Sequence, residues 1–363
     1  MTRTMHNASV TSLEPWQDAR RTPPEFPPDA PDTFEWWYFD AQLTSGQALV
    51  VAFLIEPDAA AAGFVYRTSA VLTRPGKPPV QAVHRTVDDA LISAADPNVR
   101  VGRAWFRGDG DTYRLVLDER NHAGLGMDLI IRRVVPGRVS PTGTDIVLGD
   151  EHGFGWVNAV PRGELAGTVT VDGQTTEVQG VAYHDHNWGG VSMASLVHHW
   201  LWGRATVGPY TAVFANAFPT RAYEVGDAGV QSLYIADRDG VLLNVCGAGE
   251  ARFTAPETAN PDSRNTRAYY AAHAVFEVEQ AGRRVTVEVT PAQFLRDIDL
   301  AAETNNLTVD ERARAAHMDV KPWYTEFQAA PVRLTIDDDT DEPARVYEGT
   351  GIVEFMDFHL NAE

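Results

Sequence analysis

Short runs of strand-forming residues recur at regular intervals along almost the whole chain, and this spacing limits the possible folds more than any other feature. Each run is rich in Val, Ile, Phe, Tyr and Trp, and Gly, Asp and Pro separate the runs, as is typical of strands joined by turns. Hairpins are predicted at Gly108-Asp109-Gly110, at Asp172-Gly173 and at Asp239-Gly240. The predicted strands are 48–55, 63–72, 101–106, 113–118, 126–132, 164–171, 197–202, 210–218, 230–235, 274–279, 283–289, 332–336 and 351–358.

A helical pattern occurs only in residues 297–316, where residues 310–315 form its best part. Many evenly spaced strands with almost no helix predict an all-β fold made of sandwiches or barrels. The density of aromatic residues favours a barrel of about eight strands, whose interior is wide enough for one small ligand. No repeat of about 20 to 50 residues is visible, which argues against propellers and solenoids.

The length of 363 residues suits two domains better than one, because a single hydrophobic core stops growing below that size. A break in the strand pattern at residues 190–196, with the sequence Gly-Gly-Val-Ser-Met-Ala-Ser, separates two similar halves. We therefore predict an N-terminal domain over residues 32–192 and a C-terminal domain over residues 193–363, packed side by side.

Repeated prolines set residues 1–31 apart from the rest of the chain. Proline has no backbone N–H and cannot donate to a β-ladder, so this segment is predicted to be an extended arm lying on the surface. Trp16 and Phe26 are its candidate anchors, and regular structure is expected to begin at Phe34.

The chain carries 30 Lys and Arg against 50 Asp and Glu, which gives a formal charge of −20. A field of this sign repels phosphates, so nucleic acids and anionic membrane surfaces are poor candidate partners. The single cysteine, Cys246, excludes an intramolecular disulfide and a cysteine-based metal cluster. The N-terminus lacks the apolar core of a secretory signal, and no window approaches the roughly 20 apolar residues of a membrane helix. We expect a cytoplasmic protein without stable membrane insertion; its oligomeric state stays open.

The first unusual segment has the sequence Phe-Glu-Trp-Trp-Tyr-Phe-Asp at residues 34–40. Side chains alternate across a strand, so Glu35 shares one face with Trp37, and Asp40 shares the other with Tyr38. One interpretation is a core strand whose glutamate pairs with an arginine. The other is a carboxyl in an apolar pocket, where desolvation raises the pKa and keeps a proton available.

A second unusual segment is a run of polar and aromatic residues that begins at Tyr183. In an extended chain, His184 and His186 face one side, and Tyr183, Asp185 and Asn187 face the other. Leaving such groups buried without partners costs roughly 1–3 kcal/mol each, so they must form a satisfied network or line a wet pocket. The segment is therefore either a hydrogen-bonded brace between the domains or part of a functional site.

A metal site is an alternative for the same segment, because His-x-His on a strand can bind Zn²⁺ with a third ligand. His198, His199 and His152 are available as that ligand. A carboxylate between two imidazoles also suits hydrogen bonding without metal, and we favour this second interpretation. No metal and no cofactor are predicted.

Residues 198–204, with the sequence His-His-Trp-Leu-Trp-Gly-Arg, add Trp200 and Trp202 to the candidate set. Aromatic side chains commonly line small-molecule sites, and their faces can stabilise a developing carbocation. Both tryptophans could equally be ordinary core. The sequence has no dinucleotide-binding Gly-x-Gly-x-x-Gly after a strand, no Walker loop, no Gly-x-Ser-x-Gly elbow and no context for a cysteine nucleophile.

Three motifs, at residues 35–40, 183–189 and 347–354 (Tyr-Glu-Gly-Thr-Gly-Ile-Val-Glu), together resemble the hydroxyneurosporene synthase (carotenoid 1,2-hydratase) family of the AttH-like superfamily. The resemblance runs from about residue 33 to the end of the chain. It implies two lipocalin-like domains with a ligand between them, in agreement with the strand pattern. Members of this superfamily add water to an isolated polyene double bond, and fungal relatives fold polyenes for intramolecular Diels–Alder cyclisation.

The resemblance also implies roles for individual residues. His186 and Trp188 match positions implicated in hydration. Where the hydratases carry Tyr-x-Asp on a following strand, this chain has Phe214-Ala215-Asn216. Phe and Asn cannot supply the same proton, so the chain departs from the hydratase pattern at this point.

The resulting hypothesis is a cofactor-free enzyme of secondary metabolism that acts on C=C bonds of a lipophilic terpenoid or polyene, such as a carotenoid, in a pocket between the domains. In a proton-initiated hydration or cyclisation, Asp185 or Glu35 is the acid, and His184 and His186 relay protons or orient groups. In a pericyclic version, an intramolecular Diels–Alder cyclase, the pocket mainly positions a flexible chain. The predicted substrate-binding residues are Trp37, Tyr38, Tyr183, Asn187, Trp188, Trp200, Trp202, Phe214 and Asn216.

The rival hypothesis from a different class is a lipocalin-like carrier that binds a lipophilic ligand without chemistry. A carrier has no need for a carboxylate beside two imidazoles in its pocket. The polar network of the Tyr183 segment is thus the feature that separates an enzyme from a carrier.

Overall fold

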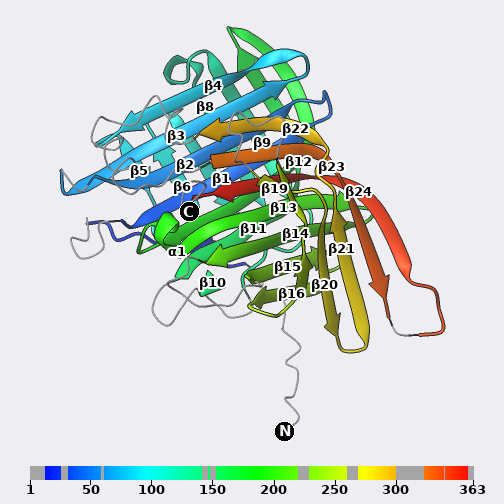
Figure 1. The fold of residues 1–363 in the computed structure, drawn as a ribbon. Coiled ribbons are helices and arrows are strands. Elements are labelled where there is room, and N and C mark those ends of the chain that lie inside the picture. Colours follow the sequence, from blue (N-terminus) through cyan, green and yellow to red (C-terminus); the bar gives the residue numbers. More distant parts are fainter. Residues whose placement is uncertain are drawn as a thin grey trace.

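Two large antiparallel β-sheets make up most of the described chain (Figure 1). The computed structural model describes residues 13–25, 32–58, 61–140, 146–147, 153–219, 229–259, 269–299, 323–338 and 340–358. Each sheet curls into a barrel-like half, which confirms the prediction of an all-β fold of two lipocalin-like units. In the described parts of the chain, no helix has the length and apolar character needed to cross a membrane.

The first sheet has the strand order β4-β3-β2-β1-β12-β11-β9-β8-β7-β6-β5, with β10 paired to β11 outside this path. Its interior is filled by large apolar side chains, among them Phe39, Phe53 and Phe106, none more than 2 % exposed. The strands are β1 (Phe34–Leu43), β2 (Ala48–Asp58), β3 (Gly63–Arg74), β4 (Lys77–Thr86), β5 (Ala90–Ile92), β6 (Asn98–Val101), β7 (Ala104–Asp109), β8 (Thr112–Leu117), β9 (Leu125–Arg133), β10 (Ile146–Val147), β11 (Gly153–Val171) and β12 (Gln174–Gly189).

The second sheet has the order β16-β15-β14-β13-β24-β23-β21-β20-β17, with β22 paired to β23 outside this path. Phe214, Phe276 and Leu334 are fully buried inside it. The strands are β13 (Val197–Val207), β14 (Tyr210–Pro219), β15 (Val230–Ala236), β16 (Val241–Gly247), β17 (Arg252–Thr254), β20 (Ala274–Gln280), β21 (Arg283–Val289), β22 (Gln293–Asp299), β23 (Trp323–Asp337) and β24 (Arg345–Asp357). A separate pair is formed by β18 (Glu257–Ala259) and β19 (Tyr269–Ala271).

The first sheet ends at Gly189 and the second begins at Val197, with the four-residue helix α1 (Met193–Leu196) between them. Predicted domain limits at 192 and 193 fall in this connection, and they remain a prediction. The predicted hairpins at Gly108-Asp109-Gly110, Asp172-Gly173 and Asp239-Gly240 join β7 to β8, β11 to β12 and β15 to β16.

Three predictions were wrong in detail. Residues 101–106 are not one strand, because Gly102, with a φ of +58°, makes the turn of the β6–β7 hairpin. Residues 297–299 belong to strand β22 and not to a helix, since they pair with β23; residues 300–316 lie outside the described chain. Trp16 does not anchor the N-terminal arm, since 52 % of its surface is exposed, and Phe26 lies outside the described residues.

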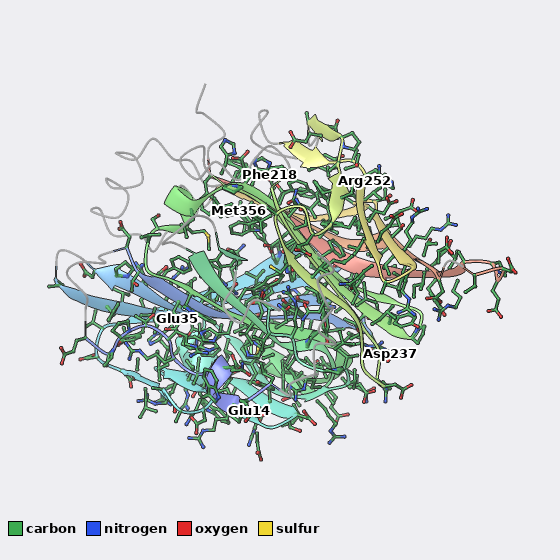
Figure 2. The ribbon with its side chains drawn as sticks, turned by 90° about the horizontal axis from the view of Figure 1, so that it is seen from below. Glu14, Glu35, Phe218, Asp237, Arg252 and Met356 are labelled. Atoms are coloured by element: carbon green, nitrogen blue, oxygen red, sulfur yellow. The ribbon has the colours of Figure 1, made fainter. Side chains whose placement is uncertain are left out.

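The N-terminal segment is also more than a surface arm. It forms a short 3₁₀ turn, η1 (Pro15–Asp18), in which Asp18 is fully buried. Figure 2 shows Glu14, at the start of this turn, on the side of the molecule that carries Glu35. The segment therefore contributes a buried carboxylate to the first barrel.

The two sheets meet through the faces of β1, β11 and β12 on one side and β13, β14 and β24 on the other (Figure 1). A shared apolar cluster includes Trp156 and Tyr183 from the first sheet and Trp202 from the second. A buried ion pair between Asp40 and Arg204 crosses the junction, with 2.8 Å between Asp40 Oδ1 and Arg204 Nε. The junction is thus a packed interior with specific polar contacts.

Candidate functional site

Strand β12 separates two polar networks, because its successive side chains point to opposite faces. His184 and His186 point into the first barrel, and Asp185 and Asn187 point toward the second sheet. The alternation predicted from the sequence is therefore present. Its consequence is that the predicted catalytic residues do not form one site.

The barrel-side network ties both imidazoles to carboxylates. His184 Nε2 lies 3.0 Å from Asp18 Oδ2, and His186 Nε2 lies 2.8 Å from Glu35 Oε1. The ring of His186 stacks on Trp37, with 4.5 Å between the ring centroids. All of these side chains are essentially inaccessible to solvent, so this network is a brace inside the barrel.

Glu35 is not the protonated acid that the sequence suggested as one interpretation. Burial alone would raise its pKa, but the hydrogen bond and the charge of His186, together with hydrogen bonds from Thr22, lower the pKa below the usual value. The backbone N–H groups of Arg21 and Thr22 donate to its two oxygens at 2.6 and 2.7 Å. Its partner is thus a histidine and the N-terminal segment, and not the arginine of the alternative interpretation.

Asp18 completes this brace, and sequence reasoning missed it. Its carboxylate also accepts a hydrogen bond of 2.7 Å from the Tyr113 hydroxyl, and its backbone carbonyl accepts one of 3.0 Å from Trp37 Nε1. A lone aspartate in a proline-rich arm carries no strand periodicity. Nothing in the local pattern therefore indicated that it would be buried.

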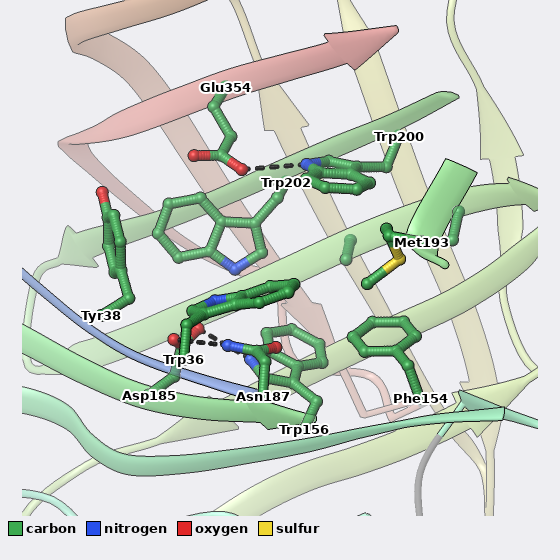
Figure 3. Close-up of a pocket in the computed structure, with 12 residues that line it drawn as sticks. Trp36, Tyr38, Phe154, Trp156, Asp185, Asn187, Met193, Trp200, Trp202 and Glu354 are labelled. Atoms are coloured by element: carbon green, nitrogen blue, oxygen red, sulfur yellow. Dashed lines mark hydrogen bonds between the residues drawn. The ribbon is translucent and has the colours of Figure 1, made fainter. Parts of the chain in front are cut away.

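A pocket lies between the sheets, on the other side of β12 (Figure 3). It encloses about 80 Å³, and its empty space reaches about 570 Å³ when the open mouth is included. Half of its twelve lining residues are aromatic, as in typical small-molecule sites. The lining residues are Trp36, Tyr38, Phe154, Trp156, Asp185, Asn187, Met193, Trp200, Trp202, Ala215, Ala217 and Glu354.

Asp185 is the carboxyl that the first sheet contributes to the pocket. Trp156 Nε1 and the Tyr183 hydroxyl donate to its Oδ2 at 2.8 and 2.7 Å, and Asn187 Nδ2 donates to its Oδ1 at 2.9 Å. Burial raises the pKa of Asp185 to about 6, although these three hydrogen bonds lower it. The group is therefore mostly ionised at neutral pH and held in one orientation.

A buried arginine supports the donors of Asp185 from behind. Arg138, 1 % exposed, donates to Asn158 Oδ1 at 3.3 Å, and Asn158 Nδ2 donates to the Tyr183 hydroxyl at 2.7 Å. The guanidinium also lies 4.9 Å from the centroid of the Trp156 ring. Both side chains that donate to Asp185 Oδ2 are thus fixed by one cation.

Glu354 is a second carboxyl in the same pocket, on strand β24 of the second sheet. Trp200 Nε1 donates to its Oε1 and the Tyr324 hydroxyl to its Oε2, both at 2.9 Å (Figure 3 shows the Trp200 bond). Burial raises the pKa of Glu354 to about 7, with contributions from the nearby carboxyls of Glu326 and Asp185. Glu354 belongs to a motif that the sequence analysis named, but it was assigned no role there. A single glutamate between apolar residues on a core strand could have indicated one.

Two buried donors of the pocket wall have no hydrogen-bond partner among the described residues. They are the Tyr38 hydroxyl and the indole Nε1–H of Trp202. Trp202 is only 7 % exposed, and its nitrogen points into the pocket in Figure 3. A buried donor without a partner costs about 1–3 kcal/mol, so an acceptor atom on a bound molecule would relieve that cost.

Five of the predicted site residues line the pocket, and Tyr183 supports it from behind. The five are Tyr38, Asp185, Asn187, Trp200 and Trp202. They come from three strands that the sequence could not align with one another. The other predicted site residues do not line the pocket, because their side chains point to the opposite faces of their strands.

Phe214 and Asn216 do not contact the pocket, because Ala215 and Ala217 occupy the pocket face of β14 and the intervening residues point into the second barrel. Asn216 Oδ1 accepts a hydrogen bond of 3.1 Å from Gln231 Nε2. Phe214 and Asn216, the counterparts of the hydratases' Tyr-x-Asp, therefore lie on the face of β14 opposite to the pocket.

Glu35, Trp37, His184 and His186 belong to the barrel-side brace, and Trp188 shares their face of the sheet. The ring of Trp188 lies flat against β11 at Gly155, where a Cβ atom would come within 1.9 Å of it. A glycine is thus required for this close approach. Trp188 also receives the guanidinium of Arg21 at 5.0 Å from its ring centroid.

The histidines proposed as metal ligands have other partners. His184 and His186 contact carboxylates and a backbone carbonyl, and His198 contacts His199 through their Nδ1 atoms at 2.8 Å. No group of three or more His, Cys, Asp or Glu side chains within the described ranges is arranged to hold a metal ion. His152 lies outside these ranges.

The fold and the pocket define a class: two-barrel, lipocalin-like proteins with an aromatic pocket between the barrels. Residues 149–243 match the Diels-Alderase-like family. The chain is 25 % identical over 260 residues to the quinolone epoxide rearrangement protein asqO of Emericella nidulans, covering 64 % of this chain and 68 % of that protein. Over 67 residues it is 34 % identical to the hydroxyneurosporene dehydrogenase of Chlorobaculum tepidum, covering 17 % and 18 %.

Two solved structures share the whole fold. A putative AttH from Nitrosomonas europaea matches with a TM-score of 0.62 at 15 % identity, covering 95 % of this chain and all of that one. CghA matches with a TM-score of 0.64 at 14 % identity, covering 95 % of both chains. The family match, the sequence relatives and the shared fold agree with the resemblance to the AttH-like and Diels-Alderase-like superfamily. The names of the two sequence relatives describe chemical activities, which agrees with the prediction of an enzyme.

Proposed function

We propose that this protein is a cofactor-free enzyme that binds a lipophilic terpenoid or polyene between its two sheets and catalyses a proton-initiated hydration or cyclisation at a C=C bond. The observation that carries the proposal is a pair of buried carboxyls, Asp185 and Glu354, in one pocket with aromatic walls. Burial raises the pKa values of both carboxyls, and carboxyls with perturbed pKa values in a cleft are typical of catalytic sites. A carrier has no use for such groups.

The walls suit a cationic intermediate. Trp36, Trp156 and Trp202 present rings to the pocket, and aromatic faces attract a developing positive charge. Across the sheet junction, the ionised Asp185 adds an opposite charge at low dielectric, where electrostatic stabilisation is strong. The narrow enclosed space favours a slender or flat part of the substrate, and the remainder extends through the mouth.

The expected acid–base profile follows from the two carboxyls. The acid form of Glu354 is present below about pH 7 and is lost as the pH rises through that value. The carboxylate form of Asp185 is present above about pH 6 and is lost as the pH falls through it. Turnover should therefore peak between these values and fall on both sides.

The test uses acyclic terpenoids as candidate substrates, namely geraniol, squalene and neurosporene, in D₂O. Protonation at carbon places deuterium in the product. Asp185→Asn keeps the shape of the side chain and loses its charge, so it should reduce turnover at least a hundredfold with little change in affinity. Asp128→Asn, an exposed carboxylate of the first sheet, is the matched control and should keep full activity. Turnover that survives Asp185→Asn would contradict the role of this carboxylate.

A second candidate is a pericyclic cyclase that works by positioning alone. The unpartnered donors of Tyr38 and Trp202 favour it, since they could hold one substrate oxygen while the aromatic walls fold the chain. The match to the Diels-Alderase-like family agrees with this candidate. A product without deuterium, formed as fast by Asp185→Asn as by the unchanged protein, would support the pericyclase over the proton-driven enzyme.

A further inference from the structure

A second buried glutamate stands behind Glu354. Glu326 on β23 pairs directly with Glu354 on β24 in the antiparallel register. Side chains of directly opposed residues project from the same face of a sheet, with Cβ atoms about 4.5–5.5 Å apart. Glu326 is 0 % exposed and Glu354 is 9 % exposed. Two carboxyls so close in a dry interior do not both ionise easily, so the pair retains a proton that an isolated carboxyl would lose.

The groups around the two glutamates also favour the retention of a proton. Tyr324 on β23, Tyr38 on β1 and Asp185 on β12 lie near Glu354. Next to Tyr38 is Asp40 on β1, which is bound to Arg204 on β13. Arg204, the buried cation among them, is bound to Asp40 by two nitrogens. Asp185 is a carboxyl near Glu354, and negative charge nearby stabilises the protonated form of Glu354.

Only Glu354 of the two lines the pocket. Trp200 and Tyr324 fix the direction of its carboxyl. The Tyr324 hydroxyl can donate to the carboxylate form and accept from the acid form, so the same contact serves both protonation states. Glu354 can therefore give up a proton to a bound molecule and take one back without moving.

We infer that Glu354 is the proton donor of the pocket, that Glu326 is the positioning residue that keeps Glu354 protonated, and that Asp185 is the carboxylate that faces the positive charge. This inference rests on the proposed function and assigns its acid. It replaces Asp185 as the first candidate for the acid, because Asp185 accepts three hydrogen bonds that favour its charged form.

The step balances in protons and electrons. The Glu354 O–H bond breaks, and the proton is captured by the π electrons of a substrate C=C bond, which forms a C–H bond and leaves a carbocation. Water adds to the cation in a hydration, and its surplus proton returns to the glutamate pair. In a cyclisation, a second C=C bond attacks the cation, and the new cation loses a proton to the pair. No oxidant or reductant is involved.

The first test needs no substrate. Infrared difference spectra of the whole protein, recorded across pH, report the C=O stretch of protonated carboxyls. We expect a band that disappears as the pH rises through about 7 and that is absent in Glu354→Gln. In Glu326→Gln the midpoint of the band should move to lower pH, because a second carboxyl no longer opposes the ionisation of Glu354. In Glu348→Gln, an exposed glutamate on the same strand, the spectrum should not change.

A band that persists in Glu354→Gln, or a midpoint that Glu326→Gln leaves in place, would overturn the inference. A purely structural role of Glu326 would change the stability of the protein and not this midpoint. Since the spectra are recorded without substrate, their outcome is independent of whether the terpenoids named above react.

The second test probes proton donation with 1,2-epoxy-3-(4-nitrophenoxy)propane, an aromatic epoxide. The Asp185 carboxylate attacks the terminal epoxide carbon, the C–O bond breaks, and the released oxygen takes the proton of Glu354, which leaves an ester on Asp185. Peptide mass spectrometry should locate that ester, and labelling should slow at least tenfold in Glu354→Gln and recover in part in Glu354→Asp. Equal rates in the unchanged protein and in Glu354→Gln would overturn the inference and leave the binding of substrates in the pocket intact.

Discussion

The two faces of strand β12 carry polar residues of similar kind, but the two faces differ in the partners of these residues and in the direction in which carboxyl pKa values are shifted. On the barrel side, His184 and His186 are bound to Asp18 and Glu35, and hydrogen bonding and the charge of a histidine lower the pKa of Glu35. On the pocket side, burial raises the pKa of Asp185, and Tyr38 beside it and Trp202 on the opposite wall offer donors that have no partner within the described chain.

The difference shows that a dense run of polar residues does not by itself mark a site. In the barrel-side network both oxygens of Glu35 accept hydrogen bonds, whereas Asp18 Oδ1 and His186 Nδ1, which lie 3.6 Å apart, have no hydrogen-bond partner within the described chain. In the pocket-side network, carboxyl pKa values are raised and two donors have no partner, so a ligand that pairs with these groups would gain binding free energy. Matched substitutions on the two faces of β12 should therefore have different effects.

The largest effect is expected for Asp18→Ala. It removes the partner of His184 and of Tyr113 from a site without solvent access, and breaking such a buried pair costs about 3–5 kcal/mol. Chemical denaturation measures the loss. Activity per folded molecule should be unchanged, since Asp18 lies on the opposite face of β12 from the pocket. Asp111→Ala, a carboxylate whose side chain is 69 % exposed, is the control and should cost less than about 1 kcal/mol. Equal effects of the two substitutions would contradict the brace.

The pH dependence of stability should have opposite signs on the two faces. The pKa of Glu354 is raised from 4.5 to about 7, so its contribution to stability is complete below pH 4.5 and is lost as the pH rises through about 7. The pKa of Glu35 is lowered, so its contribution is present above 4.5 and is lost as the pH falls through the lower value.

Glu354→Gln should therefore stabilise the protein at pH 8, by up to about 3 kcal/mol, and have little effect at pH 4. Glu35→Gln should destabilise it at pH 8. Urea unfolding at the two pH values measures both. The same sign for both variants at pH 8 would show that the two faces do not differ in the way described.

The smallest effect is a contrast between two tryptophans. Trp37→Phe loses the hydrogen bond from Nε1 to the Asp18 carbonyl, whereas Trp202→Phe loses no bond within the described chain. Trp37→Phe should cost about 1–2 kcal/mol more. Binding of all-trans-retinol, a fluorescent polyene, should weaken about three- to tenfold in Trp202→Phe and not change in Trp37→Phe. Weaker binding in Trp37→Phe alone would place the ligand inside the barrel.

The sequence carried enough information for the fold class, the hairpins and the alternation of β12, because strand periodicity and turn chemistry are local properties. It could not show which face of β12 meets the second sheet, since both faces are buried and both are polar. This is why Glu35 and His186 were grouped with Asp185. Only the packing of the two sheets separates them.

The other differences have similar causes. The match of Phe214-Ala215-Asn216 to Tyr-x-Asp could not reveal that Ala215 takes the pocket face, because that depends on the pairing of β13 with β14. Glu354 and Glu326 are 28 residues apart in the sequence, and only the β23–β24 register brings them together. The register of this hairpin depends on the length of its loop and on which faces of the strands are buried, and the residues next to each glutamate do not show either.

The central claim is that ligands bind between the sheets and not inside the first barrel. A crystal structure of the protein with all-trans-retinol tests it most directly. We expect electron density for the polyene between Trp36 and Tyr38 on one side and Trp200 and Trp202 on the other, with the hydroxyl end near Trp202 Nε1. Density among Phe106, His184 and His186 in the first barrel would contradict it.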